Sequence, residues 1–344
     1  MKKRIYGLLL AGLLNANFVI AQSAITPSDL KADYPSEYVV VKGDTLWGIS
    51  GRFLNQPWRW PELWGVNPQI QNPHLIYPGD VLYLTWVDGQ PRLGLRPGEQ
   101  RLSPRVREMP LEQAVTAIPL RDIQSFINEN IVVQEDILSF APYVVAGENR
   151  RLISGAGDKV YARGELVRNE GNQAIYRPAR EYVDPLTNEF LGYELFKVAD
   201  TRITAVNEDI ITMELARSNE EVRTTFRVLP TEESRIQSVF YPKSAPDGVE
   251  GLIIGLLRGV ASAGQFDAVV LNVGQREGIE AGHVFSVFRT GEVVRDPVSG
   301  GQIQLPSEEA AVLMVFKSFD KVSYGLIMRA TNVVSIGDEI RNPN

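Results

Sequence analysis

The chain has 344 residues, of which 44% are hydrophobic and 22% are charged, as expected for a folded soluble protein of two or three domains. Its 42 acidic residues outnumber its 35 basic ones, and the net charge of −7 argues against nucleic acid or anionic lipid as a partner. The chain has no cysteine, which excludes disulfides, thiol catalysis and a lipid-modified cysteine.

Residues 1–21 have the layout of a secretory signal peptide. Basic residues at 2–4 precede an apolar run over 5–14, and Val19 and Ala21 suit cleavage after residue 21. The alternative, a membrane anchor, is disfavoured because two asparagines interrupt the run before it reaches the about 20 residues of a span. Cleavage leaves 32 basic and 42 acidic residues, a net charge of −10. We therefore expect an exported, periplasmic protein with no transmembrane span in the mature chain.

Two segments are predicted to be connectors. Residues 22–37 are polar and punctuated by prolines, which indicates a short tether. Residues 86–117 contain arginines interspersed with proline and glycine, which indicates an extended linker. The arginines leave two interpretations, a solvated linker or a strap on an acidic face, and linker composition favours the first.

Between these connectors, residues 38–85 predict a small β-α-α-β module. We expect a strand over 39–41, followed by a helix that Asp44 or Thr45 caps and whose apolar side chains share one face. A second helix begins near Pro61, and a closing strand follows a Pro-Gly turn of type II.

All five tryptophans lie between Trp47 and Trp86, and four of them are within this module. Aromatic faces can stack on sugar rings, but a module of this size also needs large side chains to fill its core. Trp64 is expected in the core because it lies in the second helix, whereas Trp58 and Trp60, beside prolines, are expected on a surface ridge.

The module resembles a LysM domain through GDTLWGIS after the first strand and LIYPGDVLYL at its end. The resemblance implies a fold that binds the N-acetylglucosamine units of peptidoglycan or chitin between the loop after the first strand and the loop before the last. Carried onto this chain, it implies a ligand groove formed by Gly43, Asp44, Thr45, Leu46, Asn72, Pro73, His74, Leu75 and Ile76. The segment 57–60 between the helices departs from the family pattern.

Residues 118–240 are predicted to form a mixed α/β and then β-rich domain, and residues 241–344 a second β-rich domain. The first begins with a helix over 120–130, followed by strands at 131–133 and 143–145 and a turn of helix at 136–140. An internal repeat is visible, since an aromatic-arginine pair precedes an Asp-Pro turn at the same spacing in both domains. These matching positions are Tyr176-Arg177 with Asp184-Pro185, and Phe288-Arg289 with Asp296-Pro297. The predicted fold class is α+β, a small β-α-α-β module followed by a predominantly β half with an internal repeat.

The residues of the chain do not assemble into a recognisable catalytic or metal-binding set. The only two histidines, His74 and His283, are far apart, whereas a catalytic zinc site needs several grouped ligands. Composition leaves a two-carboxylate glycosidase open, but the paired glutamates at 220–221, 232–233 and 308–309 are expected to be solvated. We therefore predict a protein that is not an enzyme and that uses no cofactor and no metal.

The C-terminal half carries a second resemblance, through APYVVAGENRRLISGAGDKVYARG, YRPAREYVDPLTNEFLGYE and VLNVGQREGIEAGHVF. These segments resemble the TsaP family of periplasmic LysM proteins associated with the type IV pilus secretin, and the C-terminal region is similar to that of the flagellar protein FlgT. The resemblance implies a Gram-negative periplasmic adaptor that anchors the outer-membrane secretin ring to peptidoglycan, in several copies around the ring. A flagellar outer-ring component, a peptidoglycan hydrolase and a surface adhesin are the alternatives. A hydrolase would need a catalytic set, and an adhesin would need a route across the outer membrane.

Overall fold

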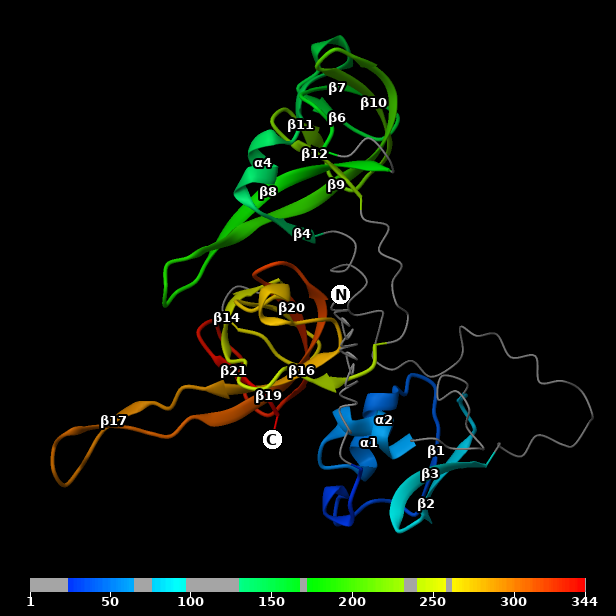
Figure 1. The fold of residues 1–344 in the computed structure, drawn as a ribbon, viewed down its shortest axis with the longest axis vertical. Coiled ribbons are helices and arrows are strands. Elements are labelled where there is room, and N and C mark those ends of the chain that lie inside the picture. Colours follow the sequence, from blue (N-terminus) through cyan, green and yellow to red (C-terminus); the bar gives the residue numbers. More distant parts are fainter. Residues whose placement is uncertain are drawn as a thin grey trace, which may run out of the picture.

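The computed structural model describes residues 24–64, 76–96, 130–167, 172–231, 240–257 and 262–343 (Figure 1). They form three units, which we call the N-terminal module (25–96), barrel 1 (130–230) and barrel 2 (243–341). The predicted signal peptide, the end of the second helix and the helix expected over 120–130 lie outside the described residues, apart from Asn130. Among the helices that the structure describes, none is long and apolar enough to cross a membrane.

The N-terminal module combines a three-stranded antiparallel sheet of order β1-β2-β3 with two short α-helices. Thr45 caps α1 by accepting a hydrogen bond from the Gly48 N–H (3.0 Å), as the sequence predicts. One buried cluster joins the helices to the sheet, and the Leu46, Ile49 and Phe53 side chains of α1 all lie in it. The elements are η1 (Pro27–Asp29), β1 (Glu37–Val39), α1 (Leu46–Phe53), η2 (Pro57–Arg59), α2 (Trp60–Trp64), β2 (Val81–Val87) and β3 (Gln90–Arg96).

The first strand, predicted over 39–41, lies instead at Glu37–Val39. The Val40 N–H still donates to the Asp80 carbonyl (2.8 Å), but the Val41 N–H donates to the Asp44 carboxylate (2.8 Å). The strand ends here because this side chain diverts the backbone donor into a turn.

The segment predicted as a tether over 22–37 is part of the module from Ile25 onward. Ile25 and Leu30 are buried, and the Lys31 N–H donates to the carbonyl of Phe53 (2.8 Å). The Arg59 guanidinium lies 2.8 Å from the Asp29 carboxylate. Apolar burial and an ion pair therefore fix a segment whose polar composition suggested a connector.

The prediction of a linker over 86–117 is wrong for its first residues, because β2 extends to Val87 and β3 covers Gln90–Arg96. Asp88 and Gly89 both have positive φ (51° and 75°), the conformation of a two-residue hairpin turn of type I′. β3 pairs with β2 from Val81↔Arg96 to Val87↔Gln90, and Leu93 is fully buried. Residues 97–117 lie outside the described residues.

The tryptophans are more buried than the sequence predicts. Trp64 is in the core, as expected, but Trp60 is also fully buried and Trp58 is only 9% exposed. The surface ridge predicted for Trp58 and Trp60 is therefore wrong. The Trp60 ring packs against Tyr241, which precedes barrel 2, with the ring centroids 5.7 Å apart.

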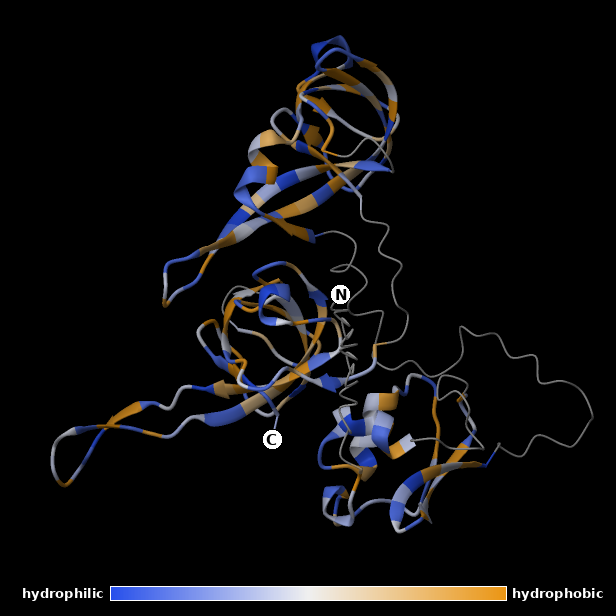
Figure 2. Cartoon of the chain, in the orientation of Figure 1, coloured by the Kyte–Doolittle hydropathy of each residue, from blue (hydrophilic) through white to orange (hydrophobic). Residues whose placement is uncertain are grey.

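Barrel 1 is a seven-stranded sheet of order β10-β7-β5-β12-β8-β9-β4 that closes because β9 also pairs with β10. Hydrophobic and hydrophilic residues alternate along its strands (Figure 2), and hydrophobic side chains that point into the barrel form one buried cluster. The strands and helix predicted between 131 and 145 are confirmed. The elements are β4 (Asn130–Val133), α4 (Glu135–Phe140), β5 (Tyr143–Gly147), η5 (Glu148–Arg150), β6 (Ile153–Ser154), β7 (Lys159–Arg163), β8 (Gln173–Val183), β9 (Phe190–Asn207), β10 (Ile210–Ser218), β11 (Val222–Arg223) and β12 (Arg227–Pro230).

Barrel 2 is a second seven-stranded sheet, of order β13-β16-β19-β20-β15-β14-β21, which closes because β16 also pairs with β21. Its interior is a separate apolar cluster. The elements are β13 (Lys243–Ser244), β14 (Gly251–Leu256), β15 (Ala268–Leu271), η6 (Gln275–Glu277), β16 (His283–Arg289), β17 (Val293–Arg295), β18 (Gln302–Gln304), β19 (Glu308–Ser318), β20 (Ser323–Ala330) and β21 (Glu339–Arg341).

The long β8–β9 hairpin of barrel 1 packs on the outer wall of barrel 2. Tyr182 and Leu191 of the hairpin share an apolar cluster with Tyr324 on that wall. Next to this cluster, Glu194 is fully buried and its carboxylate lies 2.7 Å from the Arg180 guanidinium. The hairpin therefore belongs to two cores, which explains why both faces of β9 are buried at Glu194 and the following residue.

Candidate functional site

The first half of the predicted groove is a tight turn that Asp44 closes. The Asp44 carboxylate accepts hydrogen bonds from the Val41 N–H (2.8 Å) and the Tyr38 hydroxyl (3.0 Å). Gly43 has φ of +97°, and a Cβ built there would meet no atom within 4 Å. Glycine is needed here for the backbone conformation, and the space above it is open.

The second half begins at the turn before β2. The Asp80 N–H donates to the Tyr77 carbonyl (3.1 Å), and Gly79 has φ of +95°, as a type II turn with Pro78 requires. The Asp80 carboxylate accepts a hydrogen bond from the Tyr77 N–H (3.0 Å). This turn has the same side-chain closure as the first one.

Two backbone hydrogen bonds hold the turns side by side. The Gly79 N–H donates to the Val40 carbonyl, and the Val40 N–H donates to the Asp80 carbonyl, both at 2.8 Å. These two bonds therefore fix the position of the loop after β1 relative to the loop before β2. Exposed backbone donors and acceptors there suit an amide-bearing ligand.

The predicted groove residues divide into three groups. Gly43 is exposed, and Asp44 and Thr45 are partly exposed. Leu46 and Ile76 are fully buried, so their side chains belong to the core, and only their backbones could face a ligand. Asn72, Pro73, His74 and Leu75 lie outside the described residues.

A small charged and aromatic cluster supports the first turn. The Arg52 guanidinium lies over the Tyr38 ring, 5.0 Å from its centroid. Burial raises the pKa of Tyr38, and its hydrogen bond to the Asp44 carboxylate raises it further. The Tyr38 hydroxyl therefore keeps its proton and acts as a donor that orients Asp44.

Two contributors to this site were missed from the sequence. The sequence pattern indicates only that Tyr38 begins the module and that Asp80 belongs to a turn motif. The sequence holds a signal for Asp80, since aspartate favours turns in which its side chain bonds to a backbone N–H nearby, but none for the role of Tyr38. The symmetric role of Asp44 and Asp80 explains why a Gly-Asp pair stands at both turns.

Other parts of the chain offer no catalytic arrangement among the residues that the structure describes. No group of three or more His, Asp or Glu side chains there could hold a metal ion. Glu220 pairs with Arg177 (3.1 Å) and Glu309 with Arg329 (3.1 Å), both at exposed positions. These carboxylates are surface ion-pair partners rather than an acid and base that face one substrate.

Comparison with known proteins identifies the module. The LysM domain family matches residues 38–85. Over 58 residues the chain is 38% identical to the uncharacterized protein YqbP of Bacillus subtilis (strain 168), a stretch that covers 14% of this chain and only 26% of that protein. The chain therefore carries a LysM domain at residues 38–85, and LysM is a binding domain rather than a catalytic one.

Proposed function

We propose that this chain is a non-enzymatic adaptor that holds peptidoglycan through its LysM domain. The observation that carries the proposal is the LysM match over 38–85 on a module whose two Asp-closed turns are held together by backbone hydrogen bonds. Gly43 leaves open space at the first turn, where a sugar could approach the backbone closely. On this proposal Gly43, Asp44, Thr45 and the Leu46 backbone form one side of the groove, and the LysM resemblance assigns the other side to residues 72–76, of which only Ile76 is among the described residues.

The experiment is cosedimentation of the purified mature chain with peptidoglycan sacculi. A matched pair of variants separates the groove from general destabilisation. Gly43 and Gly89 both have positive φ (97° and 75°) and open space for a Cβ, but Gly89 lies in the distant β2–β3 turn. We expect Gly43→Ala to reduce binding at least fivefold more than Gly89→Ala does. Equal binding by both variants would remove Gly43 from the site, and failure of the parent chain to sediment would overturn the proposal.

The second part of the proposal concerns the β half of the chain. It docks on an outer-membrane secretin ring of a type IV pilus in a Gram-negative periplasm and so couples the ring to the wall. Its support is the resemblance of the C-terminal segments to the TsaP family, and a fold-level likeness alone does not define a partner. Photo-crosslinking from barrel 2 in intact cells tests it. Capture of the secretin supports the proposal, whereas capture of a flagellar ring protein favours the flagellar alternative.

We also propose that barrels 1 and 2 are two copies of one unit. Around barrel 1 the strands run β8-β9-β10-β7-β5-β12, and around barrel 2 they run β16-β19-β20-β15-β14-β21, so each strand has a counterpart at the same place. The two Asp-Pro turns are also alike. Asp184 accepts from the Leu186 N–H and Asp296 from the Val298 N–H, both at 2.8 Å.

A further inference from the structure

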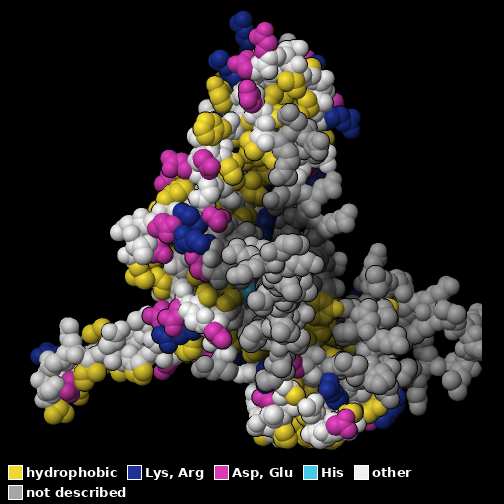
Figure 3. Space-filling view, viewed as in Figure 1, with side chains coloured by type: hydrophobic (Ala, Val, Ile, Leu, Met, Phe, Trp, Pro, Cys, Tyr) yellow, Lys and Arg dark blue, Asp and Glu magenta, His cyan; other side chains and the backbone are white. Residues whose placement is uncertain are grey.

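Barrel 2 carries a projecting hairpin, which we call the arm (290–305). It contains β17 and β18, lies between β16 and β19 in the chain, and extends from the barrel as a two-stranded ribbon (Figure 1). Hydrophobic side chains lie along it (Figure 3), among them Val298 at the tip, which is 94% exposed, and Ile303 on β18, which is 47% exposed. A two-stranded ribbon of this size has little stability of its own, so the arm would be stabilised by a further strand.

One edge of the arm has unpaired backbone groups. The Leu305 N–H donates to the Glu292 carbonyl (2.9 Å), which makes these two residues a hydrogen-bonded pair of the hairpin. Hydrogen-bonded and non-hydrogen-bonded pairs alternate along an antiparallel ladder, so the N–H and C=O groups of Gln302 and Gln304 point away from β17. Among the described residues β18 pairs with β17 alone, and its outer edge is therefore open in a single copy of the chain.

The two edges of the arm differ in charge. Natural proteins commonly protect exposed strand edges with charged side chains. On β17 (Val293–Arg295) the arginine has this role, and Glu292 directly precedes the strand. The three residues of β18 (Gln302–Gln304) are all exposed, and none of them is charged. The unprotected edge of the arm is therefore the edge of β18.

The corresponding edge in barrel 1 is covered by a third strand. Given the strand equivalence proposed above, the arm corresponds to the β8–β9 hairpin, and β18 to the start of β9. The edge of β9 that faces away from β8 pairs with β4, from Tyr193↔Val133 to Phe196↔Asn130. No described strand takes this place beside β18. The arm therefore lacks the third strand that its counterpart has.

The sequence of β18 is complementary to itself. Gln302-Ile303-Gln304 reads the same in both directions, so antiparallel pairing of two such strands places Ile303 opposite Ile303 and glutamine opposite glutamine. The outward backbone groups of both glutamines are then paired. A register shifted towards the barrel would place Gln302 opposite Pro306, which has no N–H, and a shift towards the tip would place Gln304 opposite Gly300 in the turn. One register is therefore favoured.

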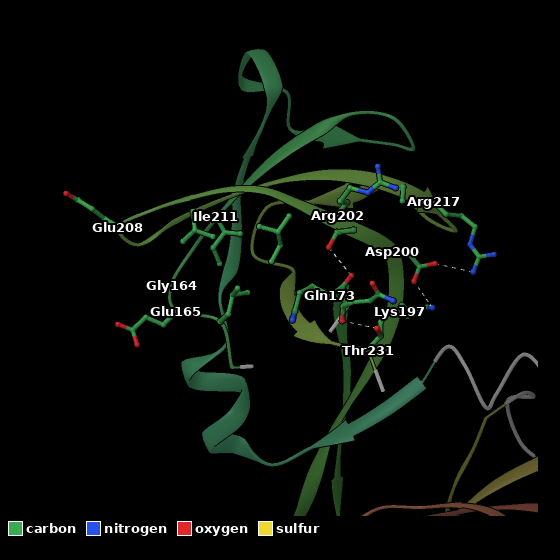
Figure 4. Close-up of a pocket in the computed structure, with 16 residues that line it drawn as sticks. Gly164, Glu165, Gln173, Lys197, Asp200, Arg202, Glu208, Ile211, Arg217 and Thr231 are labelled. Carbon is green, nitrogen blue, oxygen red and sulfur yellow. Dashed lines mark hydrogen bonds and ion pairs between the residues drawn. The ribbon is translucent and has the colours of Figure 1, made fainter. Parts of the chain in front are cut away.

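The open end of barrel 1 is not a competing seat for the arm. Its cavity of about 1060 Å³ is lined by acidic and basic side chains together, including Glu208 and Arg202 (Figure 4). Asp200 in this lining already pairs with Lys197 (2.9 Å) and Arg217 (3.1 Å). This mixed charge selects no partner, and the cavity borders segments that lie outside the described residues.

We propose that two copies of the chain associate through their arms, by antiparallel pairing of β18 with β18 about a twofold axis at Ile303. The two strands of each arm then belong to one sheet, and Val294, Ile303 and Leu305 of both copies share one face of it. The contact is isologous and closes at two copies. It depends on backbone pairing rather than on opposite charges, and on neither sugar binding nor a membrane partner.

Disulfide trapping tests the register directly, because the natural chain has no cysteine. The two Ile303 residues form a non-hydrogen-bonded pair, whose Cα atoms lie about 4.5 Å apart, within the range of a disulfide. The control is Val298→Cys, which is more exposed (94% against 47%) but lies beyond the paired strands. Under mild oxidation we expect Ile303→Cys to give at least fivefold more disulfide-linked dimer than Val298→Cys. A yield no greater than in the control would overturn the proposal.

Proline substitution supplies an independent readout on the cysteine-free chain. Gln304→Pro removes an N–H from the open edge of β18, and Val293→Pro, directly across the hairpin, removes one from the edge of β17. We expect sedimentation velocity of the parent chain to show a weight-average mass that rises with protein concentration towards that of two copies. Gln304→Pro should weaken this association at least fivefold, and Val293→Pro should leave it unchanged. A parent chain that is monomeric at all concentrations, or equal association by the two proline variants, contradicts the proposed contact.

Discussion

At the scale of single residues, two positions show how backbone conformation and side-chain type interact in the barrels. Thr225, two residues before β12, has φ of 72° and is exposed, and Gly337, two residues before β21, has φ of 96°. The left-handed region costs a residue with a Cβ about 1–2 kcal/mol, and more crowding arises when the Cβ is branched. The backbone at 225 keeps this conformation because the Thr225 N–H and the Val144 carbonyl form a hydrogen bond (2.8 Å).

We therefore expect Thr225→Gly to stabilise barrel 1. Relief of the left-handed strain should exceed the entropy that glycine loses on folding, for a net gain of about 0.5–1 kcal/mol. The reverse change, Gly337→Thr, should destabilise barrel 2 by at least about 1 kcal/mol. Urea unfolding followed by circular dichroism measures both. A loss of stability in Thr225→Gly would show that the threonine side chain contributes more than its strain costs.

His283 makes the stability of barrel 2 depend on pH. Its pKa is lowered from 6.5 to about 4, first by burial and then by the nearby Lys243 ammonium, while the Glu280 carboxylate acts in the opposite direction. The neutral ring accepts a hydrogen bond from the Glu280 N–H (3.1 Å). Between the two pKa values the unfolded chain binds the proton and the folded chain does not, so acidification favours unfolding.

The stabilisation that comes from the neutral ring is complete above pH 6.5 and is lost as the pH falls towards 4. We expect the free energy of unfolding to drop by about 2 kcal/mol between pH 7 and pH 5. His283→Asn keeps an acceptor at the same position without the titration, and it should flatten this dependence. An equally steep loss in the His283→Asn variant would assign the effect to other groups.

At the scale of elements, the turn chemistry of the sequence identified most of the N-terminal module. The Thr45 cap, the Pro78-Gly79 turn and the apolar face of α1 follow from short-range rules, and each lies where it was predicted. β3 was missed because Pro91 and the arginines suggest a linker. Pro91 is tolerated there because β3 pairs on one side only, with β2. The Asp88-Gly89 pair was the available signal for this hairpin.

The contribution of β3 to the core of the N-terminal module can be tested with fluorescence. All five tryptophans lie between Trp47 and Trp86, so tryptophan emission reports on the N-terminal module. Leu93 is fully buried, and Leu93→Ala should lower the stability of the module by about 2–4 kcal/mol. Val87 on the paired strand is 49% exposed, and Val87→Ala should change it by less than about 0.5 kcal/mol. Equal midpoints for the two variants in urea would mean that β3 contributes nothing to the core.

At the scale of the whole molecule, contacts between the units account for the side chains that sequence patterns misplaced. Trp58 was expected on the surface and Glu194 follows no buried pattern, yet both are buried at contacts with barrel 2 or its approach. Alternation along a strand tells which residues face the interior of its own sheet, but not what covers the outer face. The outer wall of barrel 2 is apolar because the β8–β9 hairpin and the N-terminal module pack on it. Local sequence patterns therefore predict much of each unit but not the contacts between the units.

Beside the contact between the barrels, the β8–β9 hairpin holds an ion pair between the buried Glu194 carboxylate and the Arg180 guanidinium, whose side chain is 45% exposed. Burial raises the pKa of Tyr182, and the Glu194 carboxylate raises it further, so this phenol stays protonated beside the charge. Arg180→Met leaves the buried Glu194 carboxylate without its cation, and because solvent screens the 45% exposed Arg180 we expect a cost of about 1–2 kcal/mol. The loss should appear as separation of one unfolding transition into two, because the hairpin joins both cores.

Two variants distinguish this effect from general loss of charge. Arg177→Met removes a pair with Glu220, whose carboxylate is half exposed, and should cost less than about 0.5 kcal/mol. Arg180→Met/Glu194→Leu removes both members of the pair and should recover at least half of the loss, because no buried carboxylate is left without its cation. Differential scanning calorimetry of the full chain measures the number of transitions and their midpoints. If Arg180→Met and Arg177→Met had the same effect, Glu194 would need no ion pair to be buried, and apolar contacts alone would hold the barrels together.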